Sequence, residues 1–271
     1  MANGGETAES IQNMEVWRVL RASEAWTSRV FPEVVVFAAG RVPVLEGERF
    51  ARAVGRTLQR RGIDTGARVR ITGPVTDIGP FLVQVNLSVG ETPARVQIPT
   101  RGRGDALPAI KRLDRQISLL ATPWRPRPWP QTARPQLHAD SVTQLVRRKI
   151  LEPAELTPQA AARAMDSMDY DAHLFIDVGT GEDAIIFRAG PYGLRLARQR
   201  YVHPPADFAS CVVVPRPAPA LTELAAVQHL CRYGLPFLFY SDPGSGRGRL
   251  LYCRYDGQLA LVAPRPLCAI A

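Results

Sequence analysis

The chain has 271 residues, of which 46% are hydrophobic and 22% charged, and 34 Lys and Arg against 25 Asp and Glu give a formal net charge of +9. This length suggests two domains or slightly more and can bury real cores, so a wholly disordered protein is excluded. No run of 18 apolar residues and no secretory signal pattern is present, so we expect a cytoplasmic protein without a membrane span. Its four cysteines are too few and too dispersed for a disulfide scaffold or a CxxC zinc site.

The positive charge is concentrated in the front half of the chain. Residues 31–120 carry a net charge of +6 and residues 121–150 a net charge of +5, whereas 1–30 and 151–271 each carry −1. A basic front half favours a polyanionic partner such as nucleic acid. The alternative is that the arginine-rich composition reflects the composition of the genome.

The first part of the chain predicts one compact α+β domain. Residues 1–30 are expected to be an N-terminal extension with a short helix that holds Trp17, Val19, Leu20 and Trp26. Residues 31–120 predict the order β-α-β-β-β-α, a four-stranded sheet with two helices on one face. The predicted elements are a strand at 31–39, a helix at 45–61, strands at 67–72, 81–89 and 94–98, and a helix at 105–120 with Asp105 as its N-cap.

A proline-rich linker follows at residues 121–140. Its five prolines predict an extended segment that could reach on the order of 60 Å at ~3.1 Å per residue. Trp124 and Trp129 in this linker could stack on bases, but we favour that they dock the linker onto a neighbouring protein surface.

The back half contains an internal repeat. A shift of 65 residues superposes Asp177, Gly179 and Gly181 on Asp242, Gly244 and Gly246, and it needs no gap. We predict two tandem small α+β domains of order β-α-β-β-β, copy 1 at 141–200 and copy 2 at 209–265, with helices capped by Thr157 and Thr222. The Asp-x-Gly-[Thr/Ser]-Gly segments predict hairpin turns.

Basic side chains line one side of each helix in the front domain. Arg49, Arg52, Arg56 and Arg60 are spaced 3, 4 and 4 residues apart, which places them within about an 80° stripe. On the second helix Lys111, Arg112 and Arg115 point away from the apolar side. Such stripes suit regularly spaced phosphates, and the alternative is an ordinary solvated face. The other face of the sheet is polar and has no aromatic pair, so recognition of folded RNA by shape and phosphate fits better than base stacking.

Enzymatic motifs are missing from the sequence. The four histidines lie at no metal-ligand spacing, and neither GxSxG nor HExxH occurs. The glycine-rich segment at 244–248 lacks the Lys-[Ser/Thr] of a phosphate-binding loop, and the repeat explains it as a turn. We therefore expect no catalytic residues, no metal and no cofactor.

Several segments resemble a known family. Val146-Arg147-Arg148-Lys149, Leu156-Thr157-Pro158, and Met165 to Asp171 followed by His173-Leu174-Phe175 are similar to the C-terminal domain of long-form ribosome hibernation-promoting factors, the sigma-54 modulation family. Leu113 to Ile117 is similar to the last helix of the N-terminal domain of that family. The duplicated tail most resembles the dormancy- and hypoxia-associated ribosome factors of actinobacteria.

The resemblance implies a ribosome-binding role. The domain at 31–120 would occupy the channel for mRNA and tRNA in the small subunit, contact 16S rRNA, block translation, and stabilise idle 70S ribosomes under stress or dormancy. Carried over by position, the candidate rRNA-binding residues are Arg49, Arg52, Arg56, Arg60, Arg70, Arg95, Lys111, Arg112 and Arg115.

The tail copies are expected to pair with each other. A unit of ~60 residues is marginal alone, and one strand face of each copy is apolar. Effective concentration favours pairing within one chain, which gives an intramolecular pseudo-dimer. The alternatives are a tail-mediated homodimer that forms 100S ribosomes, and an RNA-processing or RNA-modifying enzyme anchored by the basic domain. The pairing residues are predicted to be Leu174, Ile185, Phe187, Leu238, Leu250 and Tyr252.

Overall fold

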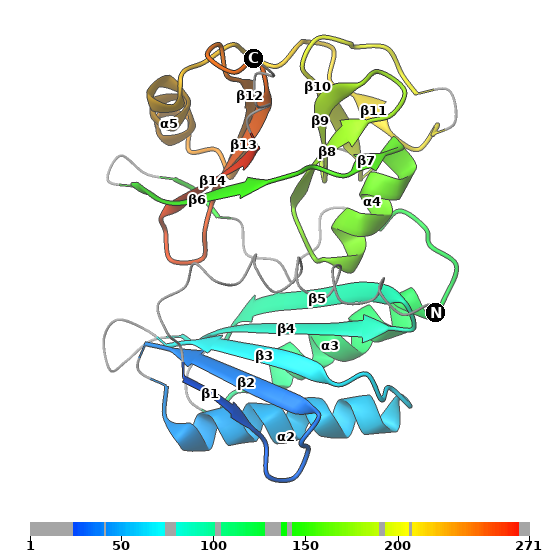
Figure 1. Ribbon diagram of the computed structural model, residues 1–271, viewed down its shortest axis with the longest axis vertical. Coiled ribbons are helices and arrows are strands. Elements are labelled where there is room, and N and C mark those ends of the chain that lie inside the picture. The colour runs from blue at the N-terminus through cyan, green and yellow to red at the C-terminus, as the bar shows by residue number, and fades with distance from the viewer. Residues whose placement is uncertain are drawn as a thin grey trace, which may run out of the picture. The chain divides into compact units, whose positions relative to one another are not determined.

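The computed structural model of the chain describes residues 24–40, 42–73, 80–100, 104–127, 137–139, 143–189, 193–205 and 208–265. The chain divides into a front unit and a back unit, with the boundary after Asp114 and with Glu91–Arg95 assigned to the back unit (Figure 1). Within the described ranges, no helix has the length and apolar character that crossing a membrane requires.

The front unit is built on a sheet of five strands in the order β1-β2-β3-β4-β5. The α+β class and the order β-α-β-β-β-α are as predicted, but the predicted four-stranded sheet is wrong by one edge strand. The elements are β1 (Glu24–Thr27), β2 (Val34–Ala39), α2 (Val44–Arg60), β3 (Ala67–Thr72), β4 (Leu82–Val89), β5 (Thr92–Pro99) and α3 (Leu107–Leu120).

The extra strand β1 includes Trp26, which we had expected in a helix. Trp26 pairs with Val36 of β2, and its ring fills the space above Gly47 of α2, where a Cβ would lie 2.0 Å from the indole. Phe31 occupies the space above Gly55 in the same way, 2.2 Å from where a Cβ would be. The two helical glycines therefore let aromatic side chains approach the backbone of α2. Trp17, Val19 and Leu20 lie outside the described residues.

Alternating apolar residues of the strands form the core of the front unit beneath α2 and α3. The helices bury the sides that the sequence predicts, with Phe50, Val54 and Leu58 on α2 and Leu113 on α3. The predicted N-cap is wrong, because the first hydrogen bond of α3 runs from Ile110 N to Ala106 O. Ala106, not Asp105, therefore precedes the first helical residue. The buried strand residues are Val34, Val36, Ala67, Val69, Ile71, Val83, Val85, Leu87, Ala94 and Val96.

The back unit contains two sheets and two helices. Sheet 1 has the order β11-β10-β9-β8-β7, and sheet 2 has the order β12-β13-β14-β6. Thr157 and Thr222 cap α4 and α5 as predicted, each accepting from the backbone N–H three residues on. The elements are β6 (Leu145–Leu151), β7 (Glu155–Leu156), α4 (Pro158–Ser167), β8 (Ala172–Asp177), β9 (Glu182–Phe187), β10 (Arg195–Arg198), β11 (Val212–Val213), α5 (Glu223–Arg232), β12 (Phe237–Ser241), β13 (Gly248–Cys253) and β14 (Leu259–Pro264).

The two copies exchange their first strands. Copy 1 contributes β6, which pairs in parallel with β14 of copy 2, and copy 2 contributes β11, which pairs in parallel with β10 of copy 1. The order of elements along the chain is close to the predicted one, and each of the two sheets is completed by a strand from the other copy. The registers repeat at the predicted shift, since Arg148 pairs with Leu261 and Val213 with Leu196.

The back unit is layered as helix, sheet, sheet and helix. Figure 1 shows α5, sheet 2, sheet 1 and α4 following one another. One apolar cluster fills the space between α4 and sheet 1, and a second fills the space between α5 and sheet 2. A third, which we call the inter-sheet cluster, lies between the sheets. Its buried members are Leu174, Ile185, Ala197, Phe239 and Leu250, with Ala172, Phe187, Val214, Ala218, Phe237 and Val262 packed against them.

Copy 1 contains a buried ion pair that copy 2 lacks. Arg188 pairs with Asp166, and each side chain is only 1% exposed. The 65-residue shift places Cys231 and Cys253 at these two positions in copy 2, and both contribute to the cluster around α5. The same fold therefore accepts either an ion pair or two thiols at this place.

We predict that Arg188→Met lowers the free energy of unfolding by at most about 3–5 kcal/mol, because the buried Asp166 carboxylate then keeps only the Arg127 guanidinium, 3.8 Å away, as a counter-charge. The double variant D166C/R188C, with the residues of copy 2, should be more stable than the single variant. Urea denaturation under reducing conditions measures both. A double variant less stable than R188M would contradict the coupling.

Candidate nucleic-acid interface

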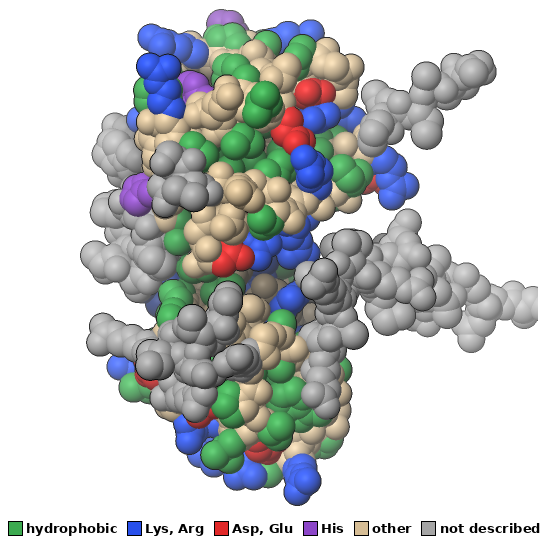
Figure 2. All heavy atoms as spheres, turned by 90° about the vertical axis from the view of Figure 1, so that its left-hand side faces the viewer, with side chains coloured by type: hydrophobic (Ala, Val, Ile, Leu, Met, Phe, Trp, Pro, Cys, Tyr) green, Lys and Arg blue, Asp and Glu red, His purple; other side chains and the backbone are tan. Residues whose placement is uncertain are grey.

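The predicted stripe of arginines lies on the solvent side of α2. Arg49, Arg52, Arg56 and Arg60 are all exposed, while Phe50 and Val54 face the sheet and are buried. In the space-filling view of Figure 2, Lys and Arg side chains gather along the lower edge of the front unit, where Figure 1 places α2. The helix therefore presents its cations to solvent as its periodicity predicts.

Two glutamates of α2 partly balance this stripe. Glu46 is buried and accepts from Arg49 Nη1 at 2.7 Å and from Gly104 N at 2.9 Å, which ties the loop before α3 to α2. Glu48 accepts from Arg52 Nε at 3.0 Å. Arg56 forms no ion pair with any carboxylate in the described part of the chain. The positive charge is therefore least compensated in the second half of the helix.

The cations of α3 lie across a shallow groove from α2. Lys111 and Arg115 are exposed and Arg112 is half-buried. The groove has Arg56 and Arg60 along one side and Leu107 and Ile110 along the other. The fold brings the seven Lys and Arg side chains of α2 and α3 to one side of the front domain, and we call these seven side chains the helix cation face. They are Arg49, Arg52, Arg56, Arg60, Lys111, Arg112 and Arg115.

Arg61 is a neighbouring cation that the sequence reasoning missed. Its guanidinium donates two hydrogen bonds to Asp114 of α3, at 2.8 and 2.6 Å. These hydrogen bonds lower the pKa of the Asp114 carboxyl. Because Arg61 falls just past the last turn of α2, the helical spacing that picked out Arg60 did not include it.

Arg70 and Arg95 are not on the helix cation face. They lie on β3 and β5, at positions that alternate with the buried residues beneath the helices, so they belong to the opposite face of the sheet. Both are half-buried. Arg70 pairs in register with Phe37 and Gln84, so one aromatic ring lies on this face at that register. The nine predicted residues therefore divide between two faces of the front domain.

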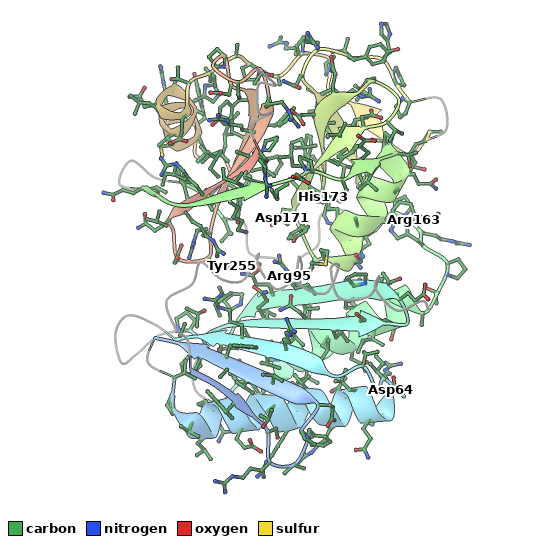
Figure 3. The ribbon with its side chains drawn as sticks, in the orientation of Figure 1. Asp64, Arg95, Arg163, Asp171, His173 and Tyr255 are labelled. Carbon is green, nitrogen blue, oxygen red and sulfur yellow. The ribbon has the colours of Figure 1, made fainter. Side chains whose placement is uncertain are left out.

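The linker is docked at Trp124, as predicted. Its indole packs against the cluster around α4 and donates to Asp166 Oδ2 at 2.9 Å. Arg163 of α4, labelled in Figure 3, places its guanidinium carbon 5.6 Å from the centre of the Trp124 ring. This tryptophan is therefore held by protein contacts of the back unit. Trp129 lies outside the described residues.

Four of the six predicted pairing residues lie in the inter-sheet cluster: Leu174, Ile185, Phe187 and Leu250. Leu238 does not, because its side chain faces α5 and belongs to the cluster there. Tyr252 shares the inter-sheet face with Phe237 by register, and its hydroxyl accepts from Lys149 Nζ at 2.7 Å.

The residues missed at this interface are Phe237 and Phe239. The 65-residue shift maps Ala172 onto Phe237 and Leu174 onto Phe239. The repeat therefore indicates that Phe239, and not Leu238, is the pairing residue equivalent to Leu174. Phe237 meets Phe187 edge to face, with ring centres 5.2 Å apart. The face of each sheet that α4 and α5 leave open is thus covered by the other sheet.

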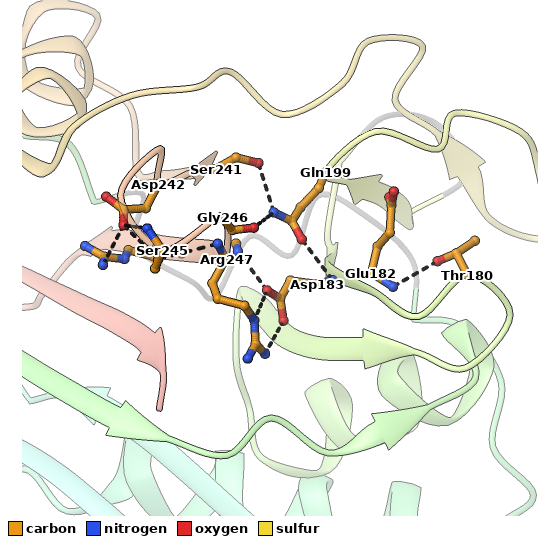
Figure 4. A network of polar contacts seen from close by, with 11 residues as sticks. Thr180, Glu182, Asp183, Gln199, Ser241, Asp242, Ser245, Gly246 and Arg247 are labelled. Carbon is orange, nitrogen blue, oxygen red and sulfur yellow. Dashed lines mark hydrogen bonds and ion pairs between the residues drawn. The ribbon is translucent and has the colours of Figure 1, made fainter. Parts of the chain in front are cut away.

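Polar contacts also join the two sheets, as Figure 4 shows. Asp183 of β9 accepts from Arg247 Nε at 2.7 Å, Arg247 Nη2 at 2.9 Å and Gly248 N at 2.7 Å. Gln199 donates to Ser241 Oγ at 3.2 Å and to Gly246 O at 2.8 Å. The interface between the sheets is therefore apolar at its centre and hydrogen-bonded at one end.

The titratable groups do not assemble a reactive centre among the residues that the structure describes. No group of three or more His, Cys, Asp and Glu there could hold a metal ion. Burial raises the pKa of Cys211 to about 12 and that of Cys253 to about 11, so both thiols stay protonated at neutral pH. Asp177 and Asp242 close the predicted turns by accepting from the backbone of Gly179 and Ser245.

The chain is similar in sequence to known proteins. A family model described as "Sigma 54 modulation/S30EA ribosomal protein C terminus" matches residues 140–196, which are mainly those of copy 1. Two relatives from Mycobacterium tuberculosis, strains CDC 1551 / Oshkosh and ATCC 25618 / H37Rv, are both called "Dormancy associated translation inhibitor". Each is 50% identical over 256 residues, which is 91% of this chain and 93% of the relative. The chain belongs to the sigma 54 modulation/S30EA family.

Membership of the sigma 54 modulation/S30EA family confirms the resemblance stated above. The names of the relatives describe translation inhibitors rather than enzymes. The identity extends far beyond the matched tail domain and includes the front domain, since it covers nine-tenths of the chain.

We predict that iodoacetamide at pH 8 leaves Cys211 and Cys253 unmodified in the folded protein. At pKa values of about 12 and 11, only about one thiol in 10⁴ and one in 10³ is the reactive thiolate at that pH. Peptide mass mapping measures the modification, and the same reaction in urea is the control that should modify every cysteine. Complete modification of either thiol in the folded protein would contradict its burial.

Proposed function

We propose that this protein is a ribosome hibernation factor of the cytoplasm. Its front domain binds 16S rRNA in the channel of the small subunit that holds mRNA and tRNA, blocks translation, and stabilises idle 70S ribosomes under stress, hypoxia or dormancy. The family membership and the names of the relatives support the inhibition of translation. The observation that carries rRNA binding is the helix cation face.

The helix cation face has the charge balance that a phosphate backbone requires. Helices α2 and α3 together carry seven Lys and Arg against three acids. One of these acids, Glu46, is buried and serves to fix the loop at Gly104. Rows of cations on rigid helices bind regularly spaced phosphates without reading sequence. This suits folded rRNA, whose helices are recognised mainly by their shape and backbone.

Arg70 and Arg95 extend the proposed rRNA contact to the second face of the front domain. Both lie on strands of a rigid sheet, which holds their side chains more precisely than a loop would. Arg95 donates to Met168 O at 3.1 Å and lies 4.4 Å from the centre of the Tyr170 ring, so an rRNA contact through Arg95 requires these contacts to open. A domain inserted into a channel is surrounded by RNA, so cations on two opposite faces agree with occlusion of the channel better than with binding to a flat RNA surface.

The tail is proposed to act as an intramolecular pseudo-dimer. The inter-sheet cluster, the contacts of Asp183 and Gln199, and the exchanged strands β6 and β11 all support pairing of the two copies within one chain. A tail whose copies are paired in this way leaves neither of its two described sheets with an apolar face open to a second molecule, and this favours a single 70S ribosome over a joined pair. The alternative is a tail-mediated homodimer that joins two ribosomes into a 100S particle.

Sedimentation of the purified protein with 70S ribosomes through a sucrose gradient tests both parts of this proposal. We expect the protein to migrate with 70S ribosomes and to form no 100S peak. A 100S peak would keep hibernation but contradict the pseudo-dimer. Protein that stays at the top of the gradient at low salt would contradict ribosome binding itself.

We predict that Arg56→Ala/Arg60→Ala weakens binding to 70S ribosomes about 10-fold or more, because two charge-assisted phosphate contacts are lost. The slope of log affinity against log salt should fall by about 1.4–1.8, since each contact contributes about 0.7–0.9. Filter binding at several salt concentrations measures both values.

The matched control is Arg216→Ala/Arg265→Ala, which removes two exposed arginines of the back unit. This control should keep the affinity and the salt slope of the parent protein. Equal losses in the two double variants would show that net charge, and not the helix cation face, determines binding.

A further inference from the structure

The two copies of the tail carry different residues at equivalent positions of their interface. The 65-residue shift makes Asp183 of copy 1 equivalent to Gly248 of copy 2, and Glu182 equivalent to Arg247. The equivalent positions 183 and 248 lie against each other. A Cβ built on Gly248 would be only 2.6 Å from the Cβ of Asp183 in copy 1 and 2.8 Å from the ring of Phe239 in its own copy, so a side chain at position 248 clashes with both copies.

The charges at this point are complementary between the copies and not within either copy. Asp183 is 2% exposed and accepts two hydrogen bonds from Arg247, which is 18% exposed. Glu182, which holds the position of Arg247 in copy 1, bonds instead to its own copy, through Arg200 N, Arg200 Nε and Tyr201 N. The ion pair therefore occurs once, with its acid in copy 1 and its base in copy 2.

A second set of hydrogen bonds is equally one-sided. Gln199 of copy 1 donates to Ser241 and Gly246 of copy 2. The residue equivalent to Gln199 in copy 2 is Pro264, which has no side-chain donor, and the residue equivalent to Ser241 is Ile176. These bonds have no counterpart in the opposite direction.

The apolar part of the interface is complementary in volume. At three equivalent positions of the interface, the side chain of copy 1 is smaller than the side chain of copy 2. The equivalent pairs are Ala172 and Phe237, Leu174 and Phe239, and Ala197 and Val262. A small face against a large face fills the space between the sheets, whereas two small faces leave cavities and two large faces overpack.

Pairing of two copy 1 faces, or of two copy 2 faces, would therefore be unfavourable. Two copy 1 faces would bring two Asp183 Cβ atoms together, and their buried carboxylates would meet without a guanidinium. Two copy 2 faces would place two glycines opposite each other, crowd the phenylalanines, and leave Arg247 without an acid.

We propose that Asp183, Arg247 and Gly248 are specificity-determining residues. They favour pairing of copy 1 with copy 2 and disfavour pairing of either copy with a second copy of the same type. Copy 1 of one molecule then does not pair with copy 1 of another, even when its face is open. This inference rests on the proposed intramolecular pairing and names the residues that select it.

The variant Gly248→Asp tests the proposal in the full chain, because it recreates inside one molecule the contact that two copy 1 faces would make. We expect the thermal midpoint of the tail to fall by about 10 °C or more. Sedimentation velocity from 1 to 100 μM should show no discrete dimer. Gly244→Asp, in the exposed turn four residues earlier, is the matched control and should change the midpoint little.

Rescue distinguishes a role in pairing from a local need for glycine in β13. The exchange variant L174F/E182R/D183G/F239L/R247E/G248D moves three residues of each copy onto the other, including Phe239, whose ring would lie 2.8 Å from a Cβ at position 248. It should recover most of the midpoint that G248D loses, whereas a purely local role of Gly248 predicts no recovery.

If G248D does not fold, a double-mutant cycle of milder substitutions at Asp183 and Arg247 tests the proposal instead. Arg247→Gln leaves Asp183 buried without a base, and Asp183→Asn leaves Arg247 without an acid. Each should reduce the ratio of folded to unfolded protein at least 10-fold, and the double variant should reduce it less than the product of the two. Additive effects would overturn the proposal.

The outcomes separate this inference from the proposed function. If the parent chain itself is a dimer, intramolecular pairing fails, and this inference fails with it. If the parent chain is a monomer and G248D is either as stable as the parent or forms a discrete dimer, this inference alone fails. Ribosome binding by the helix cation face is measured separately and is unaffected by either result.

Discussion

The tail depends on one constraint, which is that neither copy can cover both faces of its own sheet. Each copy has a single short helix, α4 or α5, and that helix covers one face. The remaining face is apolar and needs a partner, because an exposed patch of this kind would cause aggregation. The inter-sheet cluster satisfies this need for both copies at once. The exchanged strands β6 and β11 add backbone hydrogen bonds to the same association.

The front domain meets the opposite requirement, since it keeps charge exposed. Its sheet has one face covered by two helices, and the helices direct their cations outward. Where acids occur they have defined positions, with Glu46 holding the loop at Gly104 and Asp114 linking α3 to Arg61. The chain thus combines a front domain that exposes its cations with a tail whose two sheets cover each other's apolar faces.

Periodicity located most elements of the fold, because the buried and exposed sides of α2, β3 and β4 alternate cleanly. It failed at β1, where four residues are too few to show a pattern, and Trp26 was assigned to a helix. Periodicity also misplaced the pairing residue of β12 by one position, at Leu238. In a strand a shift of one residue moves a side chain to the other face of the sheet, and Leu238 faces α5. Strand exchange left no trace in the sequence, because β6 has the same composition whether it pairs within copy 1 or with copy 2. For the candidate site, helical spacing found the helix cation face. It could not reveal the pairing of Arg61 with Asp114, since these two residues are 53 positions apart in the chain.

The pairing of β6 with β14 has a consequence for the folding of the nascent chain. These strands lie over a hundred residues apart in the chain, with Arg148 paired to Leu261. During synthesis β6 leaves the ribosome long before its partner exists, so sheet 2 cannot close until β14 has emerged. Contacts of such high sequence separation slow folding. Sheet 2 therefore matures only after β14 is translated, and a nascent chain that stalls before β14 holds an unfinished sheet.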